Sequence, residues 1–384
     1  MKKSQVRILT THCGSLPRTD GLQPLMAAQA RGETADPHAV SAAVSESMRE
    51  VVEQQLRSGI DVGNDGEQAR ISFSSYVTLR MAGFGGSGQR KSAQDLAEYG
   101  LAQPGVGNPA AVNLRAPPNC VAPVRYERLD EAANECDEFL QIAGDSSAGF
   151  QEAFMTAASP GIIAMTMLND YYPSYQEYLF AVAEEMRSEY ELIVSKGFVL
   201  QLDCPDLAME RHMSYQDRPL IDFQEVVALN IKAINQSLRN IAPDRVRLHV
   251  CWGNYEGPHH YDVPLEPILP LLYQANVGAL SLEMANPRHA HEYKLFDRLP
   301  LPPSMLLIAG VIDTKTKYVE HPEVVSDRIL RAVQVVGDPT RVMAGTDCGF
   351  DTSAGAGRVE RGLVWAKLKA LSQGAQVASH QISW

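Results

Sequence analysis

Short apolar runs that end in polar residues recur eight times along this 384-residue chain. Each run is rich in branched residues and is bounded by turn residues, as is typical of strands buried on both faces of a parallel sheet. Stretches with helical periodicity lie between the runs. One of them, 38–58, follows Asp36 and Pro37 and ends before Gly59. The predicted strands are 7–15, 60–67, 162–168, 198–205, 246–253, 278–286, 306–313 and 341–349.

Eight strands that alternate with helices predict a (β/α)8 barrel, the TIM barrel. That fold typically takes about 250 residues, so roughly 130 residues are surplus. We expect residues 1–384 to form one barrel domain, with most of the surplus in an insertion after the second strand, over 83–159 at the barrel mouth. Within it, 121–129 and 138–143 are predicted as strands. A doubly wound open sheet is the alternative, weakened because no Gly-rich phosphate motif follows the first predicted strand.

Composition narrows the class of partner. The chain has 34 Lys and Arg against 46 Asp and Glu, a net charge of −12, which argues against nucleic acid and against an anionic membrane surface. No apolar run approaches the ~20 residues that span a bilayer, and no apolar segment typical of a signal peptide follows the basic N-terminus. Six cysteines are too few for a disulfide framework. We therefore expect a cytoplasmic protein with reduced thiols that acts on small molecules, its oligomeric state left open.

Alternation along the predicted strands assigns their side chains to faces. His249 and Cys251 share one face of their strand, and Leu248 and Val250 share the other. If the apolar faces meet the helices, the polar residues at the carboxyl ends point inward, where active sites of this fold lie. We place Arg247 at the bottom rim near solvent, because an unpaired guanidinium between barrel and helices is costly. The predicted inward set is His12, Glu67, Asp203, His249, Cys251, Glu283, Asp313 and Cys348.

Four members of this set predict a metal site. His249, Cys251, Glu283 and Cys348 supply an imidazole, a carboxylate and two thiolates, a combination that suits Zn²⁺. A His-x-Cys pair also arises by chance, and a buried Cys is usually just a small hydrophobic residue. Because all four residues fall at predicted strand ends, we favour the metal.

Several motifs, in this order and at these positions of the barrel, resemble one family. The chain resembles the catalytic half of cobalamin-independent methionine synthases, especially their short, single-domain members, and is similar to epoxyalkane:coenzyme M transferase. The resemblance implies a (β/α)8 barrel, zinc held by His249, Cys251, Glu283 and Cys348, and alkylation of a zinc-bound thiol. It also implies that Asp203 and Glu67 hold the amino group of homocysteine. The motifs are TTHCGSLPR at 10–18, DGE at 65–67, LQLDCP at 200–205, HVC at 249–251, SLE at 281–283, GVID at 310–313 and DCG at 347–349.

We therefore expect zinc-dependent transfer of a methyl or other alkyl group to a thiol, with homocysteine or a related thiol as acceptor. Coenzyme M or glutathione is the alternative acceptor, for whose acidic group Arg18, Arg70 or Arg288 would serve. A zinc hydrolase or lyase on the same barrel is disfavoured by the cysteine pair, and a non-catalytic metal-binding protein by the many inward acids. The segment that stacks on folate in the family has no Trp here, so the alkyl donor stays open. The expected catalytic residues are Asp203, Glu67, Asp313 and His12, and the expected substrate contacts are Ser15, Asn169 and Arg288.

Overall fold

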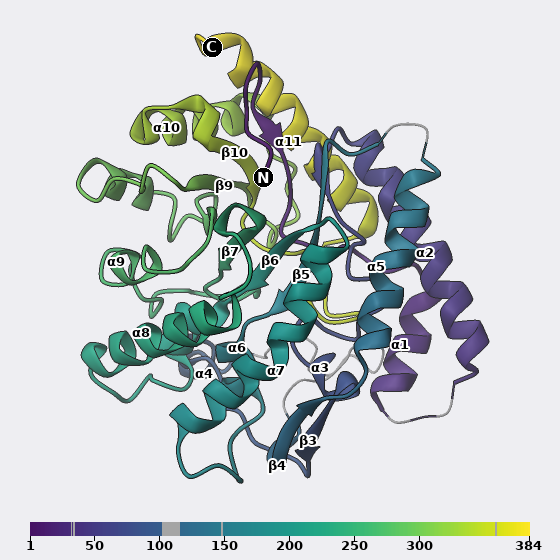
Figure 1. Cartoon of the computed structure of the whole chain (residues 1–384). Helices are drawn as coiled ribbons and strands as arrows, with labels where there is room; N and C mark the ends of the chain where they lie inside the picture. Colours follow the sequence, from purple (N-terminus) through teal and green to yellow (C-terminus); the bar gives the residue numbers. More distant parts are fainter. Residues whose placement is uncertain (32, 34, 102–115, 147–148, 358) are drawn as a thin grey trace.

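The computed structural model describes residues 1–31, 33, 35–101, 116–146, 149–357 and 359–384. Eight parallel strands form a sheet in the order β1-β10-β9-β8-β7-β6-β5-β2, and a parallel bridge between Thr11 and Val62 joins its two edges. The sheet thus closes into a barrel with helices around it (Figure 1), which confirms the predicted TIM barrel. The barrel strands are β1 (Leu9–Thr10), β2 (Val62–Gly63), β5 (Glu152–Ala158), β6 (Val199–Asp203), β7 (Val246–Val250), β8 (Ala279–Glu283), β9 (Leu306–Ile312) and β10 (Val342–Thr346).

Helices connect the strands as the periodicity predicts. The stretch 38–58 is confirmed as part of α2. Helix α7 opens at Ser174, whose hydroxyl accepts a hydrogen bond from the Glu177 amide. Helix α8 begins at Leu220 without a side-chain cap. The helices are α1 (Leu22–Ala30), α2 (Pro37–Arg57), α3 (Val77–Arg80), α4 (Gln94–Glu98), α5 (Leu129–Gly144), α6 (Pro160–Thr166), α7 (Tyr175–Ser195), α8 (Leu220–Ser237), α9 (Leu269–Leu272), α10 (Pro322–Val336) and α11 (Arg361–Gln381).

The third predicted strand is wrong. Residues 162–168 lie mostly in helix α6, because the Ser159 hydroxyl accepts a hydrogen bond from the Ile162 amide and Pro160 occupies the first helical position. The third barrel strand is β5, which pairs with β2 and β6. The predicted insertion 83–159 therefore ends in a barrel strand. Residues 138–143, which were predicted to form a strand within that insertion, are part of the amphipathic helix α5.

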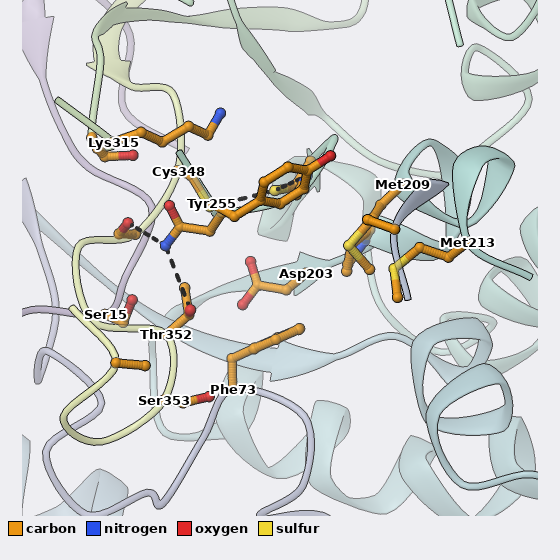
Figure 2. Close-up of a pocket in the computed structure, with 18 of the residues that line it drawn as sticks. Ser15, Phe73, Asp203, Met209, Met213, Tyr255, Lys315, Cys348, Thr352 and Ser353 are labelled. Carbon is orange, nitrogen blue, oxygen red and sulfur yellow. Dashed lines mark hydrogen bonds between the residues drawn. The ribbon is translucent and has the colours of Figure 1, made fainter. Parts of the chain in front are cut away.

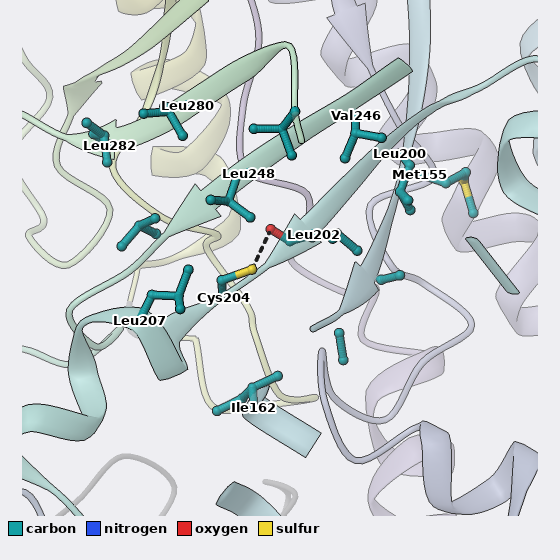
Figure 3. Close-up of a cluster of buried hydrophobic side chains, with 14 of the residues drawn as sticks. Met155, Ile162, Leu200, Leu202, Cys204, Leu207, Val246, Leu248, Leu280 and Leu282 are labelled. Atoms are coloured by element: carbon teal, nitrogen blue, oxygen red, sulfur yellow. Dashed lines mark hydrogen bonds between the residues drawn. The ribbon is translucent and has the colours of Figure 1, made fainter. Parts of the chain in front are cut away.

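The main hydrophobic core lies between the barrel and its helices. Leucines on the outer faces of neighbouring strands pack together there, among them Leu200, Leu202 and Leu248 (Figure 3), as alternation predicts. Two smaller clusters contain other buried hydrophobic residues of the barrel strands. Met1 packs against both of them. One cluster is formed by Leu9, Ala279, Leu306, Ile308 and Met343, and the other by Val62, Phe154 and Val199.

Arg247 corrects a second expectation. It is two residues before His249 and therefore shares its face, so its side chain lies among strand residues and is only 1% exposed. The guanidinium donates hydrogen bonds to Gln201 Oε1, Thr11 Oγ1 and the His12 carbonyl at 2.8 to 3.0 Å. It also lies 3.5 Å from the centre of the Phe154 ring. These partners offset the cost of burying the charge that led us to expect the rim.

A two-stranded antiparallel sheet of β3 (Met81–Gly85) and β4 (Asn119–Tyr126) lies outside the strand ring, beside α7 (Figure 1). The Tyr126 amide donates to Glu185, and the Tyr126 hydroxyl donates to Glu189, both on α7. This hairpin therefore docks against the outer helix layer, whereas the segment that follows β3 approaches the barrel mouth. Among the described residues, no helix is long and apolar enough to cross a membrane.

Candidate active site

His249, Cys251 and Cys348 bring three potential metal ligands together at the carboxyl end of the barrel. Their ligand atoms all lie within 4.8 Å of one another, and all three side chains are buried. His249 lies in strand β7 and Cys251 directly follows that strand, whereas Cys348 follows β10, three strands away in the barrel. The two thiol sulfurs are 3.4 Å apart. The donor group, as we call these three residues, can hold a metal ion through two soft ligands and one borderline ligand.

The ring of His249 is oriented by Asp203 at the end of β6. His249 Nδ1 lies 2.8 Å from Asp203 Oδ1, and Gln201 donates a hydrogen bond to the same oxygen at 2.7 Å. A proton on Nδ1 would leave Nε2 free to bind a metal, the arrangement that carboxylates commonly impose on metal-binding histidines. Burial alone would lower the pKa of His249, but its interactions with the neighbouring Cys13 and with Asp203 raise it well above its usual value.

The donor group opens into a cavity of about 480 Å³. Figure 2 shows Met209 and Met213 on one side of this cavity, Ser15 and Lys315 on the other, and Asp203 between them. Residues 89–93, in the segment that follows β3, also line it. The cavity therefore combines an apolar side with a polar side that carries the sulfur ligands and carboxylates.

Four buried polar atoms of residues on the cavity wall have no hydrogen-bond partner among the described residues. These are Ser15 Oγ, Glu67 Oε2, Arg90 Nε and Thr314 Oγ1. The other Glu67 oxygen accepts from Thr156 Oγ1 at 3.0 Å. Glu67 has a φ of 59°, a left-handed conformation rare outside glycine and typical of functional sites when it does occur. Burial and the nearby charge of Asp203 raise the pKa of Glu67 to about 8, although the charges of Arg70 and Arg18 act in the opposite direction.

Glu283, expected as the fourth metal ligand, is not in the donor group. Its Oε2 lies 2.6 Å from Lys315 Nζ, and its Oε1 accepts from the Trp252 amide at 3.1 Å. Burial alone would raise the pKa of Glu283, but the charge of Lys315 lowers it. Its role as a metal ligand stays a prediction.

The other predicted site residues do not line the cavity. His12 Nε2 lies 2.8 Å from Gln55 Oε1, and burial lowers the pKa of His12 to about 3, so the ring is neutral. Asn169 bonds within its own loop, donating to the Tyr172 carbonyl. Arg288 is exposed and donates to the His260 carbonyl. Asp313 accepts a hydrogen bond from the Lys315 amide at 2.8 Å.

Sequence reasoning missed several cavity residues. One of them is Cys13, which lies beyond the end of β1 at Thr10, so strand alternation does not give the direction of its side chain. Its thiol lines the cavity and donates to the Thr346 carbonyl at 3.0 Å. Lys315, Met209 and Met213 lie in loops and 3₁₀ turns, where no periodic pattern gives their direction.

Comparison with known proteins places this site in context. No protein-family description matches the chain. The methionine synthase of Thermococcus kodakarensis is 25% identical over 342 residues, which cover 89% of this chain and 84% of that protein. The methionine synthase of Saccharolobus solfataricus is 23% identical over 376 residues, covering 97% and 95%. The chain is a homologue of these methionine synthases.

Solved structures agree in fold with that homology. The B12-independent methionine synthase of Shewanella sp. W3-18-1, in complex with selenomethionine, has a TM-score of 0.72 and 20% identity, with 98% of each chain covered. A putative vitamin-B12-independent methionine synthase of Listeria monocytogenes has a TM-score of 0.63 and 17% identity, again with 98% of each chain covered. The chain therefore shares their fold over 98% of its length.

Proposed function

We propose that this homologue of methionine synthases transfers a methyl group to the thiol of homocysteine. The observation that carries the proposal is the donor group of His249, Cys251 and Cys348 at the wall of a cavity that also holds Glu67 and Asp203. A soft metal site binds a thiol, and the two carboxylates suit an ammonium. The homologues named methionine synthase, which align over most of the chain, support the same reaction.

Zinc is the metal that we propose for the donor group. Two thiolates and an imidazole are its common ligands, and a His249 ring with its proton on Nδ1 has Nε2 available. When bound, zinc would deprotonate a coordinating thiol and so make it nucleophilic at neutral pH. All six cysteines are free in the structure, as such a site requires.

The polar side of the cavity fits the rest of homocysteine. Glu67 Oε2 and the Asp203 carboxylate can accept hydrogen bonds from its ammonium, each charge-assisted bond contributing about 1.5 to 3 kcal/mol. The unpartnered Ser15 hydroxyl can donate to its carboxylate. We assign these three residues to the acceptor. The surroundings of His12, Asp313, Asn169 and Arg288 support local structural roles.

The basic side chains near the cavity are already paired with carboxylates, which argues against an acidic thiol such as coenzyme M as the acceptor. Arg18 pairs with Asp351 at 2.9 Å, Arg70 pairs with Glu135 at 2.8 Å, and both ion pairs are buried. Two further cations, Arg90 and Lys91, pair with Glu210 and Asp217. Arg288 is exposed and does not line the cavity. Lys315, which also lines the cavity, pairs with Glu283. A sulfonate would therefore meet cations that already have carboxylate partners, whereas the ammonium of homocysteine meets carboxylates directly.

The methyl donor would approach from the apolar side. Met209 and Met213 line that part of the cavity and can contact an uncharged methyl carrier while keeping water from the reacting thiol (Figure 2). The loop residues 89–93 would border the entrance.

Product formation tests this proposal. The purified protein would be loaded with zinc and incubated with homocysteine and candidate methyl donors, and methionine would be measured by mass spectrometry. We expect about one zinc per chain and methionine formation, and both should be lost in Cys251→Ser and Cys348→Ser. Cys204→Ser is the matched control, because Cys204 is equally buried but packs in the core near Leu202 (Figure 3). Full zinc content in both ligand variants would contradict the assignment.

A further inference from the structure

The Glu67 carboxylate is held on one side by the side chain of Thr156. Thr156 lies in β5 and is only 1% exposed, and its hydroxyl donates a hydrogen bond to Glu67 Oε1 at 3.0 Å. The same hydroxyl oxygen accepts a hydrogen bond from Arg70 Nη1 at 2.9 Å. Because a guanidinium only donates hydrogen bonds, the single hydroxyl proton of Thr156 is left for Glu67.

Arg70, which orients this hydroxyl, is itself held in place. Its Nε and Nη2 donate to the two carboxylate oxygens of Glu135 at 2.8 and 3.1 Å, and the side chains of this ion pair are 2% and 3% exposed. Arg70 Nη1 also donates to the backbone carbonyl of Thr156 at 2.9 Å. Arg70 would therefore keep most of its partners if the Thr156 hydroxyl were removed.

The backbone of Glu67 and a neighbouring glycine complete this arrangement. The Glu67 amide donates to Asp65 Oδ1 at 3.0 Å, and the Glu67 carbonyl accepts from Arg18 Nη2 at 2.9 Å. A Cβ at Gly14 would lie 2.7 Å from Glu67 Oε1 and 2.6 Å from Thr156 Cγ2. The carboxylate is therefore packed between Gly14 and Thr156, and Oε2 is its oxygen without a partner among the described residues.

We propose that Thr156 is a positioning residue that holds Glu67 with Oε2 available to an ammonium, and that it thereby makes the site select amino-thiols. A hydroxyl that donates to a carboxylate favours the charged form of the carboxylate. The charged form is the one that binds an ammonium most strongly. The inference rests on the acceptor of the proposed function, because it assigns a residue that makes the site prefer this acceptor to a thiol without an amino group.

The charges that face Glu67 act in both directions. Burial and the charges of Asp203 and Asp65 raise the pKa of Glu67 to about 8. The charges of Arg70 and Arg18 oppose that rise. The hydrogen bond from the Thr156 hydroxyl acts in the same direction as the two arginines, so its removal should raise the pKa of Glu67 further.

Methionine and 4-(methylthio)butanoate test the selection, since the second compound is methionine without its amino group. Neither compound has a thiol, so neither needs a metal-bound thiolate to bind. Calorimetry on wild type and on Thr156→Val would measure both affinities between pH 6 and 9. At pH 8 we expect Thr156→Val to bind methionine about 10-fold more weakly, because a hydrogen bond to a charged group is lost. The affinity for 4-(methylthio)butanoate should not change, and the rise of methionine affinity with pH should move up by about one pH unit.

Thr166→Val is the matched control. Thr166 is also 1% exposed, and its hydroxyl has no hydrogen-bond partner among the described residues, so this variant should bind both compounds as wild type does. Thr156→Ser keeps the hydroxyl and should keep the preference for methionine. Should Thr156→Val not fold, Thr156→Ala removes the same hydroxyl without placing a methyl group beside the carboxylate, and the same results are expected of it.

The outcomes separate this inference from the function on which it rests. A folded Thr156→Val that keeps the wild-type preference for methionine and the wild-type pH profile would overturn the inference and leave the proposed acceptor standing. Equal weakening of both compounds in this variant would show a structural effect without selection, which also overturns it. Wild-type protein that binds methionine no more tightly than 4-(methylthio)butanoate would refute the ammonium site of the proposed function and this inference together.

Discussion

At the scale of single residues, the protonation of Glu67 should depend on what occupies the cavity. Its pKa is raised to about 8 by burial and by the charge of Asp203, so the empty site carries a mostly protonated Glu67 at pH 7. An ammonium brought beside it favours the charged form and lowers this pKa. We therefore predict that methionine, which has the ammonium but no thiol, releases up to about one proton per site on binding at pH 7, and binds more tightly as pH rises from 6 to 8.

Calorimetry of methionine binding in two buffers with different ionisation enthalpies measures that proton. Glu67→Gln is the matched control, because the amide keeps the size of the side chain and has no proton to lose. Equal proton release by wild type and Glu67→Gln would show that another group titrates.

The direction of a side chain inside a strand could be predicted from the sequence. The direction of a side chain beyond a strand end could be predicted less well. Alternation along β7 correctly places His249 on the inner face. Glu67 and Cys348 come after their strands end, so their arrival at the cavity depends on the turns. Lys315 carried no signal at all, because an ion pair between residues 32 positions apart leaves no local pattern.

At the scale of elements, Ser159 decides that the run after it is a helix. Its hydroxyl accepts from the Ile162 amide at 3.0 Å and donates to Asp206 Oδ1 at 2.6 Å. Ser159→Ala removes the cap and leaves a buried carboxylate oxygen without that donor. We predict a loss of about 2 to 3 kcal/mol in the free energy of unfolding, measured by urea denaturation.

Ser174→Ala is the comparison for this prediction. Ser174 caps α7 in the same way, but its surroundings are exposed, so we expect a loss of about 1 kcal/mol or less. Similar losses in the two variants would mean that the bond between Ser159 and Asp206 contributes nothing beyond the cap.

The error at this element has a physical cause. A short apolar run is compatible with a buried strand or a buried helix, and periodicity alone does not separate them. All seven residues of α6 are buried, so this helix has no polar face to reveal its period. The sequence signal that distinguishes them is Ser159 followed by Pro160, a cap and a first-turn proline. Strand β5 was not predicted as a barrel strand, because its residues were assigned to the insertion.

At the scale of the whole molecule, the barrel could be predicted because eight strands alternate with helices. The predicted number of strands is right although one predicted strand is wrong, because β5 takes its place in the barrel. Ring closure then brings the ends of β6 and β7 and the segment after β10 to one cavity. Cys251 and Cys348 meet there although they are 97 positions apart in the sequence. The path of the loop segment 89–93 to the cavity could not be predicted in this way, because it depends on side-chain contacts such as that between Arg90 and Glu210.

The central claim is that the donor group binds a metal that takes the homocysteine thiol as a ligand. X-ray absorption at the zinc edge, recorded on the zinc-loaded protein before and after titration with homocysteine, counts the sulfur ligands directly. We expect two sulfur ligands at rest, from Cys251 and Cys348, and three with homocysteine bound. Two sulfurs that persist at saturating homocysteine would contradict the claim.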